Sequence, residues 1–69
     1  MNFVSNLNVY KYKDDVDGRL AYIVAEDAME AERFLRDETI LPVKLQEFKP
    51  ISEVPKAPRR KGVWINKIN

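Results

Sequence analysis

The sequence predicts a small α+β domain of β-β-α-β-β order, in which an antiparallel sheet carries one helix packed on one face. Three observations indicate this fold class. Two apolar runs flank an Asp-Gly turn, which is typical of a β-hairpin. A capped segment with apolar residues at helical spacing follows the hairpin. Two further apolar runs, separated by a proline-rich stretch, complete the chain of 69 residues. A single thin core is expected, since a chain of about this size buries only about 60% of its unfolded surface.

The first two strands are expected to form the hairpin. Because side chains alternate along a strand, the first strand places Val9 on one face and Tyr10 and Tyr12 on the other. The turn at 14–18 has five residues, which indicates a longer loop or a bulge rather than a two-residue turn. The second run, 19–25, is almost continuously apolar. We therefore expect neighbours to cover most of both its faces.

A helix is predicted from Ala28 to Asp37 or Glu38. Asp27 is a favoured N-cap residue, and Glu30 completes a looser form of the capping box. Acidic residues at this end also complement the helix dipole. The apolar positions expected to face the sheet are Ala28, Ala31, Phe34 and Leu35.

The rest of the chain is divided by prolines. A third strand is predicted over 43–48, bounded by prolines on both sides, and a closing strand over 62–68. Between them, 49–61 contains four prolines-or-basic clusters that favour a stiff, extended crossing with a turn near Ser52. The whole chain, 1–69, is interpreted as one domain with an ordered core of about 7–48.

Charge is distributed unevenly along the chain. Residues 1–43 carry five basic and nine acidic side chains, a net charge of −4, whereas 44–69 carry seven basic and two acidic ones, a net charge of +5. Such a split indicates either a basic binding surface backed by an acidic one or two halves that attract each other within the fold.

The composition argues against most enzyme classes. The chain has no cysteine and no histidine, and only two glycines, so thiolate or imidazole chemistry and a glycine-rich phosphate loop are excluded. We expect a non-enzymatic protein without a cofactor. Three aspartates crowd the predicted turn, but strand residues follow where a calcium loop would continue, so a solvated turn is preferred to a metal site. These aspartates are Asp14, Asp15 and Asp17.

Two binding surfaces are predicted. The first binds a protein partner, through a sheet edge or through the acidic helix face, and a homodimer through the same edge is an alternative. The residues of that helix face are Glu30, Glu32, Arg33 and Asp37. The second surface binds nucleic acid through the basic segment 56–61, with aromatic stacking by Trp64. Its cations are Lys56, Arg59, Arg60 and Lys61. The alternative for this segment is a solvated loop that neutralises the acidic helix, with Trp64 anchoring the core.

The stretch 21–35 resembles a pattern in small uncharacterised phage and bacterial proteins with a β-hairpin–helix–strand core. In that pattern a strand ends in alanine, and a capped helix then opens with an acid-alanine pair and carries Phe-Leu on its face. The resemblance implies a small accessory protein or inhibitor that binds a host or replication component. No run approaches the ~20 apolar residues of a membrane span, and the N-terminus lacks the features of a secretory signal. A cytoplasmic location without membrane contact is expected.

Overall fold

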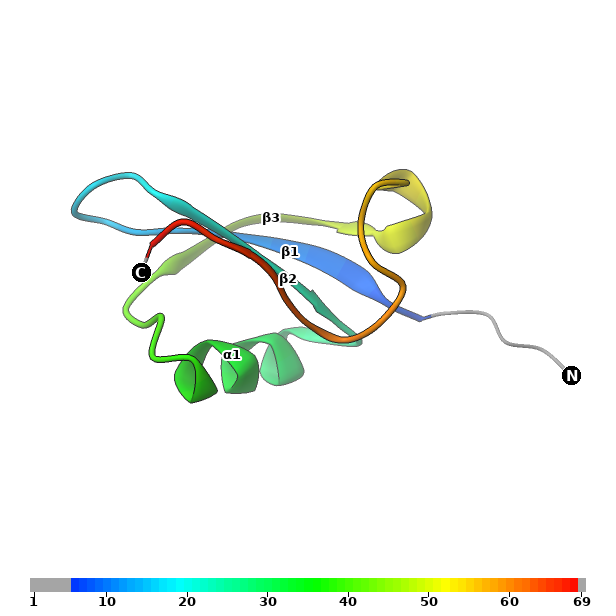
Figure 1. The fold of residues 1–69 in the computed structure, drawn as a ribbon, viewed down its shortest axis with the longest axis horizontal. Coiled ribbons are helices and arrows are strands. Elements are labelled where there is room, and N and C mark those ends of the chain that lie inside the picture. Colours follow the sequence, from blue (N-terminus) through cyan, green and yellow to red (C-terminus); the bar gives the residue numbers. More distant parts are fainter. Residues whose placement is uncertain (1–5, 69) are drawn as a thin grey trace, which may run out of the picture.

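The chain forms a four-stranded antiparallel sheet with one helix against one face (Figure 1). This computed structural model describes residues 6–68; the first half of the N-terminal stretch considered for a secretory signal lies outside that range. The elements are β1 (Asn8–Lys13), β2 (Leu20–Ala25), α1 (Ala28–Asp37), β3 (Lys44–Pro50), the 3₁₀ helix η1 (Ile51–Glu53) and β4 (Gly62–Asn66). The strand order is β3-β1-β2-β4, so β3 and β4 are the two edges. The predicted fold class is confirmed.

The β1–β2 hairpin closes through the predicted five-residue loop. The N–H of Asp14 donates to the carbonyl of Arg19 at 2.9 Å, and the N–H of Gly18 donates to the carbonyl of Asp14 at 3.1 Å. The Asp14 carboxylate accepts a further hydrogen bond from the N–H of Val16 at 2.7 Å. Gly18 has φ of 70°, a conformation in which a Cβ would be strained. Local hydrogen bonding therefore fixes the loop.

Helix α1 begins as predicted, with one difference in its cap. The Asp27 carboxylate accepts from the N–H of Glu30 at 2.8 Å. The Glu30 carboxylate accepts from the N–H of Glu26 at 2.9 Å rather than from the capping residue itself. Both carboxylates thus satisfy backbone donors that the first turn of a helix leaves without partners.

The helix packs across β2 and β4. Ala31 and Leu35 are fully buried, and Phe34 is half-buried, as the apolar stripe predicts. Ala28 is exposed, and its prediction as a sheet-facing residue is wrong. Helical spacing identifies a face of the helix but does not determine which of its turns reach the sheet.

The sheet has an apolar cluster on each face. On the helix side the buried residues are Tyr10, Tyr12, Ala21, Ile23, Ala25, Ala31, Leu35 and Ile40. On the far side, a smaller cluster consists of Val9, Val24, Ile51 and Ala57, with Leu7, Tyr22, Val54 and Trp64 packed against it. The predicted alternation of β1 is confirmed, since its tyrosines and its valine lie in different clusters.

Both edge strands contain a β-bulge. On β3, Glu47 lies opposite Lys11 and Leu45 lies opposite Tyr12, so Gln46 is the extra residue. Consequently Leu45 and Phe48 lie on the helix side, where Phe48 stacks on the Tyr10 ring. Simple alternation, which places these two residues on opposite faces, fails here because a bulge shifts the phase of a strand.

The bulge of β4 has the same effect. Val63 lies opposite Ile23 and Ile65 lies opposite Tyr22, so Trp64 is the extra residue. The alternation predicted for 62–68 puts Trp64 and Ile68 on one side, but Trp64 packs on the far side and Ile68 on the helix side. Trp64 therefore stands on the face opposite the helix.

The segment 51–61 connects the two edges by crossing one end of the far face. β3 extends to Pro50, two residues beyond its predicted end, and η1 follows at the predicted turn. The N–H of Ile51 donates to the carbonyl of Leu7 at 3.0 Å, and Ile51 and Ala57 are buried against the sheet. In Figure 1 this yellow-to-orange segment and α1 lie on opposite sides of the sheet. The crossing thus leaves the other end of the far face uncovered.

Candidate functional site

Two of the four cations of the basic segment are used by the fold. Nη1 of Arg59 lies 3.4 Å from the carbonyl oxygen of Ile51, 3.2 Å from that of Val54 and 3.1 Å from that of Ala57. These are the carbonyls around which the crossing turns. A guanidinium has several donors in a fixed plane, which suits it to bind converging carbonyls. Arg59 therefore holds the crossing in shape.

Lys61 is the second engaged cation. Its Nζ lies 3.1 Å from one Glu30 oxygen and 3.7 Å from a Glu26 oxygen. The hydrogen bond to Glu30, followed by the charge of Glu26, raises the pKa of Lys61. The pKa of Glu30 falls, first through the bond from the Glu26 N–H and then through Lys61. The basic segment and the acidic helix thus attract each other, as one of the two interpretations of the split charge expects.

Lys56 and Arg60 are the remaining cations of the segment. Both are exposed, and neither forms an ion pair with a residue in 6–68. The structure consequently divides the four predicted phosphate-binding cations into two structural residues and two free ones. Trp64 is brought to the sheet and not to these two side chains, since it packs with Tyr22.

The predicted acidic helix face is also divided. Glu30, Arg33 and Asp37 follow each other at spacings of three and four residues and share one side of α1. Arg33 lies 3.9 Å from Glu30, so that side is of mixed charge. Glu32 lies on another side, near Tyr12: burial first, and then the Glu32 carboxylate, raises the pKa of Tyr12 to about 12. The four residues do not form one acidic surface.

A different group of side chains comes together on the far face. We call it the open sheet surface, and it consists of Lys11, Lys13, Tyr22, Glu47, Lys49 and Trp64. The strand register places these residues: Lys11 lies opposite both Tyr22 and Glu47, and Lys49 lies opposite Val9, which is in the far-side cluster. None of the three lysines forms an ion pair within residues 6–68.

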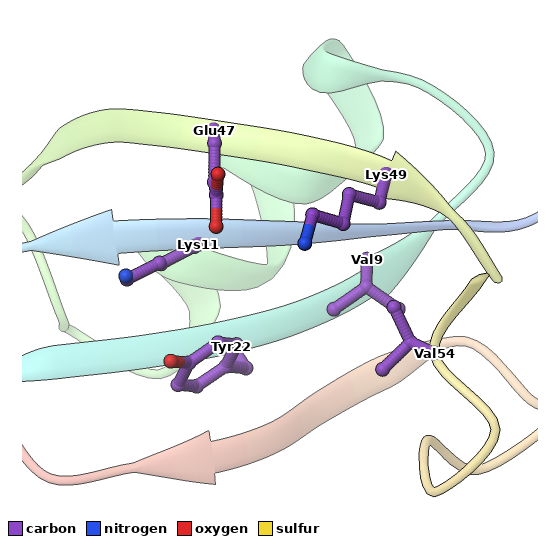
Figure 2. Close-up of a pocket in the computed structure, with 6 residues that line it drawn as sticks. All are labelled: Val9, Lys11, Tyr22, Glu47, Lys49 and Val54. Atoms are coloured by element: carbon purple, nitrogen blue, oxygen red, sulfur yellow. The ribbon is translucent and has the colours of Figure 1, made fainter.

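A shallow hollow of about 200 Å³ lies within this surface. Figure 2 shows its lining, with Val9 and Lys11 from β1, Tyr22 from β2, and Glu47 and Lys49 from β3; Val54 of the crossing closes one end. α1 is behind the sheet in this view. The floor is therefore apolar and aromatic, and the rim carries two lysines and one carboxylate.

Tyr22 and Trp64 form the aromatic part of the surface. Their ring centroids are 5.8 Å apart and their planes meet at 66°, an edge-to-face arrangement. Both side chains are half-buried. Trp64 is thus partly the core anchor that the alternative interpretation expects, and part of it remains accessible.

The lysines of the open sheet surface were not among the predicted site residues, although a signal for them exists. Tyr10 and Tyr12 alternate with Lys11 and Lys13, so burial of the tyrosines on one face places the lysines together on the other. Lys49 has no such local signal, because its position depends on the pairing of β3 with β1.

No protein-family model, curated protein or solved structure matches this chain. Within 6–68, no group of three or more acidic, histidine or cysteine residues is arranged to hold a metal ion. No helix in the same range has the length and apolar content to cross a membrane. The geometry of the open sheet surface is therefore the basis for a functional proposal.

Proposed function

We propose that this chain is a small non-enzymatic interaction protein that binds an anionic chain molecule on the open sheet surface. The observation that carries the proposal is the meeting of Lys11, Lys13 and Lys49 on one face without carboxylate partners in 6–68, beside an apolar and aromatic hollow. Clustered cations attract anions, and an apolar floor adds contact area that free counter-ions do not use.

The single carboxylate of this surface has a defined effect in the proposal. Glu47 lies opposite Lys11 and reduces the local positive charge. Replacing Glu47 by Gln preserves the size of the side chain and removes its charge. We therefore expect Glu47→Gln to tighten the binding of an anion, in the opposite direction to a lysine substitution.

The experiment measures binding of inorganic polyphosphate by calorimetry at low salt. Lys11→Ala with Lys49→Ala should weaken binding about tenfold or more, because two phosphate contacts are lost. The matched control is Lys56→Ala with Arg60→Ala, which removes the same charge from the basic segment and should change affinity less than threefold. Absence of polyphosphate binding, or a greater loss in the control, contradicts the proposal.

A protein partner is the second candidate function, favoured by exposed apolar residues on the helix side. Phe48 is 57% exposed and Leu45 is 43% exposed, and both lie on β3 beyond the helix. The bulge at Gln46 argues against partner binding by strand addition at this edge, because bulges disrupt the row of backbone donors and acceptors. A partner would bind the side chains of this strip instead. The accessory or inhibitor role implied by the resemblance belongs to this candidate.

This candidate has its own test. Phe48→Ser with Leu45→Ser should remove self-association or binding of the apolar dye ANS, and should leave polyphosphate affinity unchanged. If the dye signal persists in this variant, the strip is not an accessible apolar surface.

A further inference from the structure

We infer that the anionic chain bound by the open sheet surface is single-stranded nucleic acid, with bases on the aromatic side of the surface and phosphates on the lysine side. This inference rests on the proposed function and adds the class of ligand. It differs from the placement predicted by sequence, because the basic segment 56–61 is replaced by lysines of β1 and β3 as the phosphate contacts.

The first argument is the separation of the aromatic residues. Four rings, those of Tyr10, Tyr12, Phe34 and Phe48, belong to the helix side. Tyr22 and Trp64 are the aromatic residues that the structure places on the far face. Aromatic side chains on an open sheet stack with bases regardless of base identity, because every base has a π-face.

The second argument is the order of chemistry across the sheet. Trp64 is on β4 and Tyr22 on β2, whereas the lysines are on β1 and β3. The strand order β3-β1-β2-β4 therefore places the aromatic rings on one half and the cations on the other. With neighbouring strands about 4.8 Å apart, the surface is about 14 Å wide. A nucleotide strand has the same lateral division, with bases on one side of its phosphate backbone.

The third argument concerns the other anions that the lysines attract. An acidic peptide and a duplex both carry charge, but neither offers unpaired bases to Tyr22 and Trp64. The hollow between Lys11 and Lys49 has an apolar floor formed by Val9 and Tyr22. Such a floor suits a planar base more than a row of hydrated carboxylates. Single strands therefore use both halves of the surface, and the alternatives use one.

The experiment titrates fluorescein-labelled oligothymidylate of about twelve nucleotides and follows its anisotropy, with Trp64 emission as a second signal. Trp64 is the only tryptophan, so a change in this emission reports on the proposed site. Tyr22→Leu and, separately, Trp64→Leu should weaken binding about 5- to 100-fold, the usual effect of losing one stacked base. The matched control is Phe48→Leu, which removes a half-exposed ring from the helix side and should leave affinity unchanged.

Salt provides a measurement that does not depend on aromatic variants. Three lysine–phosphate contacts predict that log affinity falls with log salt with a slope of about −2 for a single strand, and Lys11→Ala with Lys49→Ala reduces it to about −0.7. This arm decides the inference if a variant of Tyr22 or Trp64 does not fold. A slope unchanged by the two lysine substitutions overturns the inference.

Other ligands separate failure of the inference from failure of the proposed function. Inorganic polyphosphate, polyglutamate and a duplex of equal length are compared with the oligothymidylate. Equal affinity for all four, or an unchanged Trp64 emission on adding oligothymidylate, overturns the inference and leaves the proposed function in place. If polyphosphate and oligothymidylate both fail to bind at low salt, both proposals are wrong.

Discussion

The ammonium of Lys61 lies 3.1 Å from a carboxylate oxygen of Glu30 and so joins the end of the crossing to the first turn of α1. The two residues are 31 positions apart, and each comes from a different side of the split charge. Glu30 also receives the N–H of Glu26. One carboxylate therefore caps the helix and fixes the segment that leads into β4.

The first prediction is that Glu30→Gln lowers stability at neutral pH and has little effect in acid. The Glu26 N–H and then Lys61 lower the pKa of Glu30 below its usual 4.5 in the folded chain. A carboxylate of lowered pKa contributes stability above its unfolded pKa and loses that contribution as pH falls through its folded pKa. Thermal melts of the variant and the wild type should therefore differ at pH 7 and converge below about pH 4.

The control for this measurement is Glu53→Gln, a carboxylate of η1 without an ion pair among residues 6–68. Its melting temperature should stay close to that of the wild type at both pH values. If the effect of Glu30→Gln does not change with pH, the stabilisation does not come from the charge.

The second prediction separates two neighbouring arginines. Arg59→Ala removes the donor that lies within 3.4 Å of three carbonyl oxygens of the crossing, and should cost about 1 kcal/mol of unfolding free energy. Arg60→Ala removes an equal charge from an exposed side chain without an ion pair in 6–68, and should change stability by less than about 0.5 kcal/mol. Urea unfolding measures both values. Equal costs would show that the Arg59 contacts do not stabilise the crossing.

Local signals were sufficient to predict the elements of this fold. The turn ahead of Gly18, the Asp27 cap and the prolines around β3 each act within a few residues, and the structure has an element boundary near each of them. Strand order is different in kind. Nothing near β3 in sequence indicates that it pairs with β1 and not with β4, because that choice depends on how 51–61 crosses the far face.

The candidate site was only partly predictable for the same reason. Alternation in β1 places Lys11 and Lys13 together, but Lys49 joins them through the pairing of β3. Arg59 and Lys61 read as binding residues because a run of cations contains no sign of the carbonyls and carboxylates that later surround them. Bulges at Gln46 and Trp64 then changed which residues share a face.

The third prediction concerns Tyr12, whose hydroxyl is buried without a hydrogen-bond partner in the described part of the chain. Replacing Tyr12 by Phe removes an unsatisfied polar group and keeps the ring, so stability at pH 8 should be equal or higher. Burial raises the pKa of Tyr12 from 10.0 to about 12. Unfolding then releases a proton between these two values, so wild-type stability falls as pH rises above about 10.

Tyr12→Phe lacks this alkaline loss. Urea unfolding at pH 8 and at about pH 11 should show a smaller decrease for the variant than for the wild type, while other groups affect both proteins alike. An equal decrease in the two proteins would mean that the Tyr12 hydroxyl does not titrate differently on folding. A large loss of stability in the variant at pH 8 would mean that the hydroxyl has a partner.

The last prediction is that deleting Gln46 promotes association through the β3 edge. Leu45 already lies opposite Tyr12 and Glu47 opposite Lys11, so removing the extra residue preserves the pairing on both sides of the bulge. A regular edge strand presents a continuous row of backbone donors and acceptors to another chain, whereas a bulge interrupts that row. Sedimentation at increasing concentration should show a larger species for the deletion than for the wild type. The control is Gln46→Ala, which keeps the bulge and should behave as the wild type; association of this variant would assign the effect to the side chain rather than to the backbone.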